Sequence, residues 1–186
     1  NPQPNTYFEV TKFWDNFSLD LYTQPRLNEF LETVERLPEV RLTGFRQQIG
    51  NTPAYYDSQS SAGWYRRLFA DNDGTNTPPG LDYSAARADT YHQFTLPHTF
   101  FGWLTLAPRA GGRLTYYSEA HEPGGSTDEE YRGVFNTGVE ATLKASRLWP
   151  EAQNSIFEID GLRHIVEPFL NYVYVPEPSA RPDELP

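Results

Sequence analysis

Long stretches of strict alternation between apolar and polar residues constrain this chain more than any other sequence feature. Residues 134–146 are the clearest case, because one parity holds only uncharged side chains, from Phe135 through Val139 and Leu143 to Ala145. The other parity carries Asn136, Glu140 and Lys144. Successive side chains in a strand point to opposite sides. The segment therefore predicts a β-strand with one apolar face and one polar face.

Two further stretches, 104–116 and 164–174, alternate in the same way, and 17–22 is a shorter case. The Gly111-Gly112 pair leaves open a hairpin turn that would divide the first of them. Across the long stretches, the predicted apolar, lipid-facing residues are Leu104, Leu106, Leu114, Phe135, Val139, Leu143, Val166, Leu170 and Tyr172. The predicted polar, lumen-facing residues are Arg109, Arg113, Asn136, Glu140, Lys144, Arg163, Glu167 and Asn171.

The length of these alternations separates two classes of β-protein. A strand of a globular protein runs for about five or six residues, whereas a tilted strand that crosses a bilayer needs roughly nine to eleven. We therefore predict an all-β fold, an antiparallel transmembrane β-barrel segment of about eight strands. On this interpretation residues 1–186 belong to a single outer-membrane β-barrel domain, as an internal fragment of a longer chain. A soluble, carbohydrate-binding β-sandwich remains the alternative, because its strands also alternate.

Composition agrees with this prediction and excludes some functions. Aromatic residues make up 15% of the chain although its mean hydropathy is −0.66, a combination expected when only every second strand residue faces lipid. The net charge of −10 argues against nucleic acid as a partner, which would favour a basic surface. The chain has no cysteine, so it contains neither disulfides nor thiolate metal sites.

Glycine and proline mark the expected connections between strands. The clearest predicted loops are 71–80 and 121–130, the second a natural extracellular candidate because outer loops are the longer ones. A weaker loop is expected at 150–154, and 176–186 is not expected to join a sheet. Leu27, Phe30, Leu31 and Val34 follow helical spacing, which predicts one short helical turn within 26–36.

Catalytic and metal-binding chemistry finds little support in the sequence. His92, His98, His121 and His164 are not spaced as metal ligands, and the acidic loop 121–130 is more simply a solvated segment. Glu140 and Glu167 are the carboxylate pair considered for glycoside hydrolysis. The charged residues of the polar parity are better explained as the lining of a hydrated barrel interior. We expect no enzyme activity, no cofactor and no metal.

Several segments resemble the LPS-assembly protein family, LptD, also called the organic solvent tolerance proteins. The resemblance rests on ERLPEV at 35–40, on 87–117 (RADTYHQFTLPHTFFGWLTLAPRAGGRLTYY), and most of all on LRHIVEPFLNYVYVP at 162–176. PDELP at 182–186 also resembles the next segment along the chain in many members of the family. The motifs occur in the family's order and cover most of residues 17–186.

The resemblance implies a role in the outer membrane of a Gram-negative bacterium. The parent protein would receive lipopolysaccharide from periplasmic bridge proteins and insert it into the outer leaflet, with a plug lipoprotein in its lumen. This segment would form the middle of the barrel wall, in contact with outer-membrane lipids. The family's jellyroll, lateral gate and cysteines match nothing here, so no gate residue is assigned. A porin-like or uptake barrel is the alternative within the same architecture.

Overall fold

The computed structural model describes residues 6–28, 32–69, 82–122 and 125–180, and β-strands dominate these ranges. The strands are β1 Phe8–Trp14, β2 Phe17–Gln24, β3 Thr33–Gln48, β4 Tyr55–Leu68, β5 Tyr83–Thr95, β6 His98–Phe100, β7 Leu104–Tyr117, β8 Ala120–Glu122, β9 Gly125–Thr127, β10 Glu130–Leu143, β11 Ala145–Asn154, β12 Ile159–Val166 and β13 Phe169–Tyr174. No helix occurs among the described residues, and so none that is long and apolar enough to cross a membrane.

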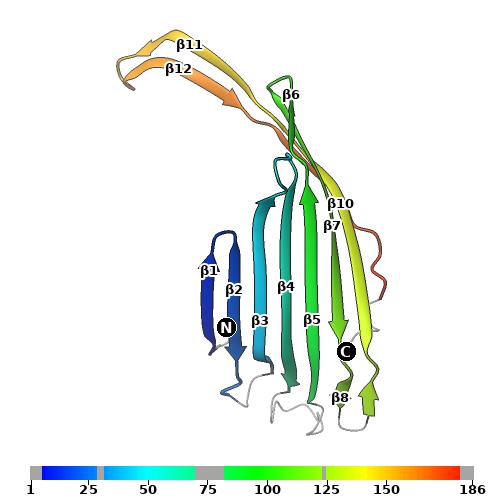
Figure 1. The fold of residues 1–186 in the computed structure, drawn as a ribbon. Coiled ribbons are helices and arrows are strands. Elements are labelled where there is room, and N and C mark those ends of the chain that lie inside the picture. Colours follow the sequence, from blue (N-terminus) through cyan, green and yellow to red (C-terminus); the bar gives the residue numbers. More distant parts are fainter. Residues whose placement is uncertain (1–5, 29–31, 70–81, 123–124, 181–186) are drawn as a thin grey trace.

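Eight strands form one continuous antiparallel path, in the order β1-β2-β3-β4-β5-β7-β10-β13. Three short strands lie off this path: β6 pairs with β7, β8 pairs with β5, and β9 pairs with β8. Figure 1 shows the path as a single curved layer. The sheet is open, because β1 and β13 are edge strands that do not pair with each other. The all-β antiparallel prediction is confirmed, whereas closure into a barrel is not a feature of these residues.

The central strands of the sheet are long. Strands β3, β4, β5, β7 and β10 contain 16, 14, 13, 14 and 14 residues, well beyond the usual five or six of globular strands. Strand β7 runs unbroken through Gly111 and Gly112, so the alternative of a hairpin turn there is wrong. An added Cβ on Gly111 would lie only 2.8 Å from the His92 carbonyl oxygen, so glycine permits this close approach of β5.

The prediction of a short helical turn in 26–36 is wrong for the residues described. Residues 25–28 have no regular structure, and β3 already begins at Thr33. Thr33 and Val34 pair with Leu68 and Arg67 of β4, so β-branched side chains and a long ladder override four apolar positions at helical spacing. Phe30 and Leu31 lie outside the described residues.

Segments 134–146 and 164–174 are each divided rather than continuous. Strand β10 ends at Leu143 and β11 begins at Ala145, while Glu167 and Pro168 separate β12 from β13. Proline has no N–H to donate to a ladder, but the Pro168 carbonyl still accepts from the Leu143 N–H at 3.1 Å. The pairing therefore continues in register from β10–β13 into the two-stranded β11–β12 sheet.

The β11–β12 hairpin, named here the arm, extends beyond the end of the main sheet and bends away to one side (Figure 1). The predicted loop at 150–154 is therefore wrong: β11 passes through Pro150 with a bulge between Trp149 and Gln153. The predicted loop 121–130 contains the short β8–β9 pair, although residues 123–124 lie outside the described ranges. The predicted loop 71–80 and residues 181–186 also lie outside them, and 175–178 join no strand, as expected.

Candidate functional site: the polar face of the sheet

Cross-strand pairing sorts the alternating residues into two faces. On β7, β10 and β13, Val139 pairs with both Pro108 and Tyr172, while Glu140 pairs with both Ala107 and Asn171. Directly paired residues lie on the same side of a sheet. The face containing Val139 is named the apolar face, and the face containing Glu140 is named the polar face.

Most of the predicted residues segregate as the alternation requires. Arg109, Arg113, Asn136, Glu140 and Asn171 share the polar face, and Leu104, Leu106, Leu114, Phe135, Val139, Leu143, Leu170 and Tyr172 share the apolar face. Arg163 and Val166 instead lie on the arm, and Lys144 and Glu167 lie where the arm joins the main sheet. The assignment of one face to lipid and the other to a lumen stays a prediction.

Two nearly buried carboxylates, Glu39 of β3 and Asp89 of β5, organise the polar face. Glu39 is 3% exposed and accepts from Arg36 at 3.1 Å and Arg41 at 2.7 Å. Each of its oxygens therefore meets a separate guanidinium group. A charge removed from water is tolerated when it is paired and hydrogen-bonded in this way.

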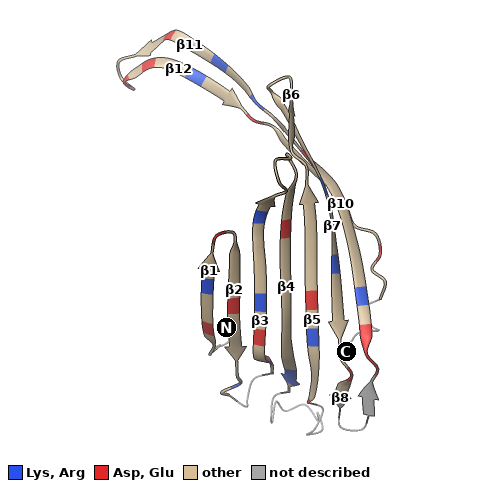
Figure 2. Ribbon diagram, in the orientation of Figure 1, with Lys and Arg blue, Asp and Glu red and all other residues tan. Residues whose placement is uncertain are grey.

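Asp89 forms a similar cluster on β5, two strands away from β3 in the sheet. It is 7% exposed, its Oδ1 lies 3.1 Å from Arg113 Nε, and its Oδ2 lies 3.6 Å from Arg87. The Thr115 hydroxyl, itself buried, donates to Oδ2 at 2.6 Å. In Figure 2 the basic and acidic positions lie close together on β3 and β5, well inside the sheet.

Tyrosine rings extend these clusters across the polar face. The guanidinium carbon of Arg36 lies 5.4 Å from the ring centre of Tyr22, and that of Arg87 lies 5.5 Å from Tyr117. Arg113, which pairs with Asp89, lies 5.9 Å from the ring of Tyr91. Such cation–π contacts fix planar arginine side chains against neighbouring strands. The polar face is thus a connected layer of carboxylate, guanidinium and phenol groups.

Sequence reasoning identified Arg113 but missed Glu39, Asp89 and their other partners. Both carboxylates sit inside strands at alternating positions, which is a local signal that marks a polar face. Glu39 pairs within β3, with Arg36 and Arg41, whereas Asp89 of β5 also pairs with Arg113 of the neighbouring strand β7. One sequence cannot show that pairing, because it depends on register.

The carboxylates considered for glycoside hydrolysis lie at different levels of the sheet. Glu140 pairs in register with Asn171, and Glu167 stands beside Lys144, four positions further along the same ladder. Four residues of strand span roughly 13 Å between backbone positions. The Arg109 side chain donates to Asn171 at 2.7 Å, which is an ordinary cross-strand contact.

The histidines also lie apart. His92 is on β5, His98 pairs with Leu106 at the end of β7 and packs edge-on against Phe100, and His164 stacks on Trp149 of the arm. Within the described ranges no three metal-ligating side chains gather. The side chain of His121 is outside the described part of the chain.

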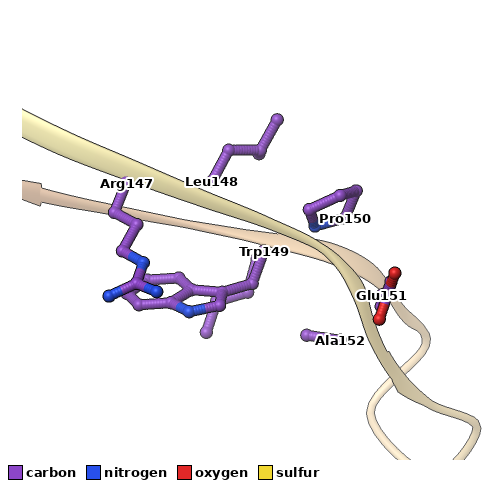
Figure 3. Close-up of a pocket in the computed structure, with 7 residues that line it drawn as sticks. Arg147, Leu148, Trp149, Pro150, Glu151 and Ala152 are labelled. Carbon is purple, nitrogen blue, oxygen red and sulfur yellow. The ribbon is translucent and has the colours of Figure 1, made fainter.

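The arm carries its own small hollow of about 550 Å³, beside Arg147, Trp149, Pro150 and Leu162. The guanidinium carbon of Arg147 lies 5.1 Å from the ring centre of Trp149, and Figure 3 shows the two side chains lying against each other. Leu148 is 63% exposed on the other side of the ribbon. Both faces of the arm mix apolar and basic side chains, and none of its strand residues is buried.

The ion pair at the base of the arm yields a prediction about stability. Lys144 Nζ lies 2.6 Å from Glu167 Oε1, but the two side chains are 63% and 49% exposed. Exposed pairs contribute about 0–1 kcal/mol because water and salt screen them. We expect Lys144→Ala to change the free energy of unfolding by less than about 1 kcal/mol. Urea unfolding of the reconstituted protein measures this; a larger loss would show that the pair holds the arm.

Comparison with known proteins does not place the chain in a family. No protein-family model matches it, and no curated protein matches it significantly. What the structure defines is a class: an open antiparallel sheet with long strands, one apolar face and one polar face crossed by ion pairs.

Proposed function

We propose that this chain is a wall segment of an outer-membrane β-barrel translocon that inserts lipopolysaccharide into the outer leaflet. The observation that carries the membrane part of the proposal is the uncovered apolar face. Among the described residues only Leu68, Ala120 and Ala180 are buried hydrophobic residues. Large apolar side chains such as Leu19, Leu42, Leu114, Phe135 and Tyr172 are between 39% and 59% exposed.

Such a face requires an apolar covering, because burying apolar surface contributes roughly 25 cal/mol per Å². A soluble sandwich would cover it with a second sheet, but the described residues supply only the two-stranded arm, which bends away at one end (Figure 1). Lipid acyl chains would cover the apolar face without a second sheet. Strands of 13 to 16 residues exceed the roughly nine to eleven that a tilted membrane strand requires.

The free edges support closure through further strands. Strands β1 and β13 each leave one side of their backbone without a ladder partner within the described residues. Unpaired backbone groups are costly in a bilayer, so membrane sheets close into barrels. On this proposal the polar face, with Glu39 and Asp89 held by arginines, lines a hydrated interior.

The cargo rests on the sequence resemblance to the LPS-assembly proteins, carried mainly by 162–176. By that resemblance the partners are lipopolysaccharide, outer-membrane lipids, a plug lipoprotein and periplasmic bridge proteins. A porin-like uptake barrel would have the same kind of wall, so a functional assay is needed to distinguish it from a translocon.

Depletion of the protein from its host tests the cargo directly. We expect newly made lipopolysaccharide at the cell surface to fall, because a translocon is required for its insertion, while uptake of small solutes is unchanged until the membrane weakens. Surface labelling of lipopolysaccharide and a solute-uptake assay measure the two. Normal surface lipopolysaccharide with reduced uptake would reject the translocon in favour of the uptake barrel.

A further inference from the structure

A row of hydrogen-bonded polar side chains interrupts the apolar face between β4 and β5. Tyr56 and Ser60 lie on β4, while Thr90 and His92 lie on β5, and register places all four on the apolar face. The Tyr56 hydroxyl is 2.6 Å from His92 Nδ1, and Thr90 Oγ1 is 2.8 Å from His92 Nε2. Ser60 Oγ lies 2.8 Å from Thr90 Oγ1. The row is therefore a chain of four groups joined by three hydrogen bonds.

Counting hydrogens shows that this chain cannot satisfy itself. With neutral imidazole, the tyrosine, histidine, threonine and serine groups each supply one polar hydrogen. Three bonds use three of these four hydrogens. If Tyr56 donates to His92, the hydrogen left over is that of Ser60 or that of Thr90, because either hydroxyl can donate in the Ser60–Thr90 bond. If His92 donates to Tyr56, the tyrosine hydrogen is left over. A donor without a partner is costly in an apolar environment, so one member of the row requires an acceptor from outside it.

A hollow of about 880 Å³ lies beside the row and opens on the apolar face. Its floor passes over Gly112, where an added Cβ would meet its nearest heavy atom at 3.6 Å. Because glycine has no side chain, the hollow reaches the backbone at this position. The apolar side chains of the lining include Phe94, Ala110, Leu114 and Phe135, and the polar residues that border it are Thr90, His92, Arg113, Glu177 and Ser179.

We propose that the hollow holds one acyl chain of an ester-linked membrane lipid, whose ester carbonyl accepts a hydrogen bond from the Tyr56 hydroxyl. This inference rests on the proposed membrane location of the apolar face. Tyr56 is the second residue of β4, next to the end of the sheet, where a tyrosine reaches the interfacial region of a bilayer. Ser60 lies four residues deeper, roughly 13 Å along the strand. The interfacial end is where ester carbonyls are found, so the row is oriented with its spare hydrogen on Tyr56.

The test compares two probe lipids that differ only in the acceptor. The protein, expressed from its complete coding sequence, is reconstituted in nanodiscs of diester phosphatidylcholine mixed with its diether analogue, and retained lipid is counted by native mass spectrometry. We expect the ester lipid to be retained about three- to tenfold better, the range that one hydrogen bond supplies. Tyr56→Phe should abolish this preference. Gly112→Leu should reduce retention of both lipids, because its side chain would fill the hollow.

Tyr91→Phe is the matched control, because Tyr91 lies on the same strand pair but on the polar face, where its hydroxyl donates to Gln93 at 2.7 Å. It should keep the ester preference. Equal retention of the two lipids by the unmodified protein, or a preference that survives Tyr56→Phe, would overturn the lipid site while leaving the membrane wall intact. Failure of the protein to enter nanodiscs at all would overturn the membrane wall as well.

Discussion

Leu114→Arg is expected to destabilise the membrane-inserted protein by about 2–4 kcal/mol, the cost of a cation at mid-depth on the lipid face of a barrel. Leu114 of β7 pairs with Thr90 and Gly133 on the apolar face, at the level of Ser60 and so roughly 13 Å along the strands from Tyr56. Urea unfolding in lipid vesicles, followed by tryptophan fluorescence, measures the change. The loss should diminish in a detergent micelle, where the headgroup layer adapts to the new charge.

Ala107→Arg is the matched control for this substitution. Ala107 lies on the same strand, and its direct partner is Glu140 on the polar face. An arginine there would stand beside a carboxylate in the proposed hydrated interior and should cost less than about 1 kcal/mol. Equal losses from the two variants, in vesicles and in detergent alike, would show that Leu114 faces protein, as in a sandwich, rather than lipid.

Replacing Asp89 by asparagine is expected to cost about 1–3 kcal/mol, the range for hydrogen bonds to a charged group. The amide would keep the shape of the side chain but remove the negative charge between Arg87 and Arg113, leaving two cations near each other. Both arginines are partly exposed, at 39% and 48% of their side-chain surface. Water therefore limits the loss, which stays below that of a fully buried pair.

Asp57→Asn provides the comparison for Asp89. Asp57 Oδ1 accepts from the backbone N–H of Arg46 at 3.0 Å in an exposed position, and asparagine retains an oxygen that accepts this bond. Its unfolding free energy should fall by less than about 1 kcal/mol. If the two variants lose the same stability, the Asp89 cluster is merely a surface feature and does not tie β5 to β7.

The sequence was sufficient to predict those features of the fold that depend on a single strand. The alternation around Leu106 and Leu114 predicted the two faces of β7, and the alternation around Val139 did the same for β10, because side-chain direction follows from the extended backbone alone. Local chemistry failed at Leu27 and Val34, where four apolar positions suggested a helical turn. Val34 is instead part of β3, where it pairs with Arg67 of β4, and Leu27 has no regular structure.

The connections between strands also depend on strand pairing that local sequence signals do not show. Pro150 and Asn154 were expected in a loop, since proline weakens a ladder, yet β11 absorbs Pro150 in a bulge and continues into the arm. The length of β11 depends on β12, which extends the β10–β13 register past Pro168. Residues 145–154 by themselves therefore do not predict the length of β11.

By itself the sequence determined that the chain makes long, two-faced strands, and it supplied the resemblance on which the lipopolysaccharide proposal depends. Only the tertiary structure decided which residues meet across strands: Asp89 with Arg113 and Thr115, and His92 with Tyr56. The physical reason is that side-chain alternation is fixed within one strand, whereas register is set between strands distant in the chain. The Asp89 cluster and the spare hydrogen of the Tyr56 row exist only once that register is fixed.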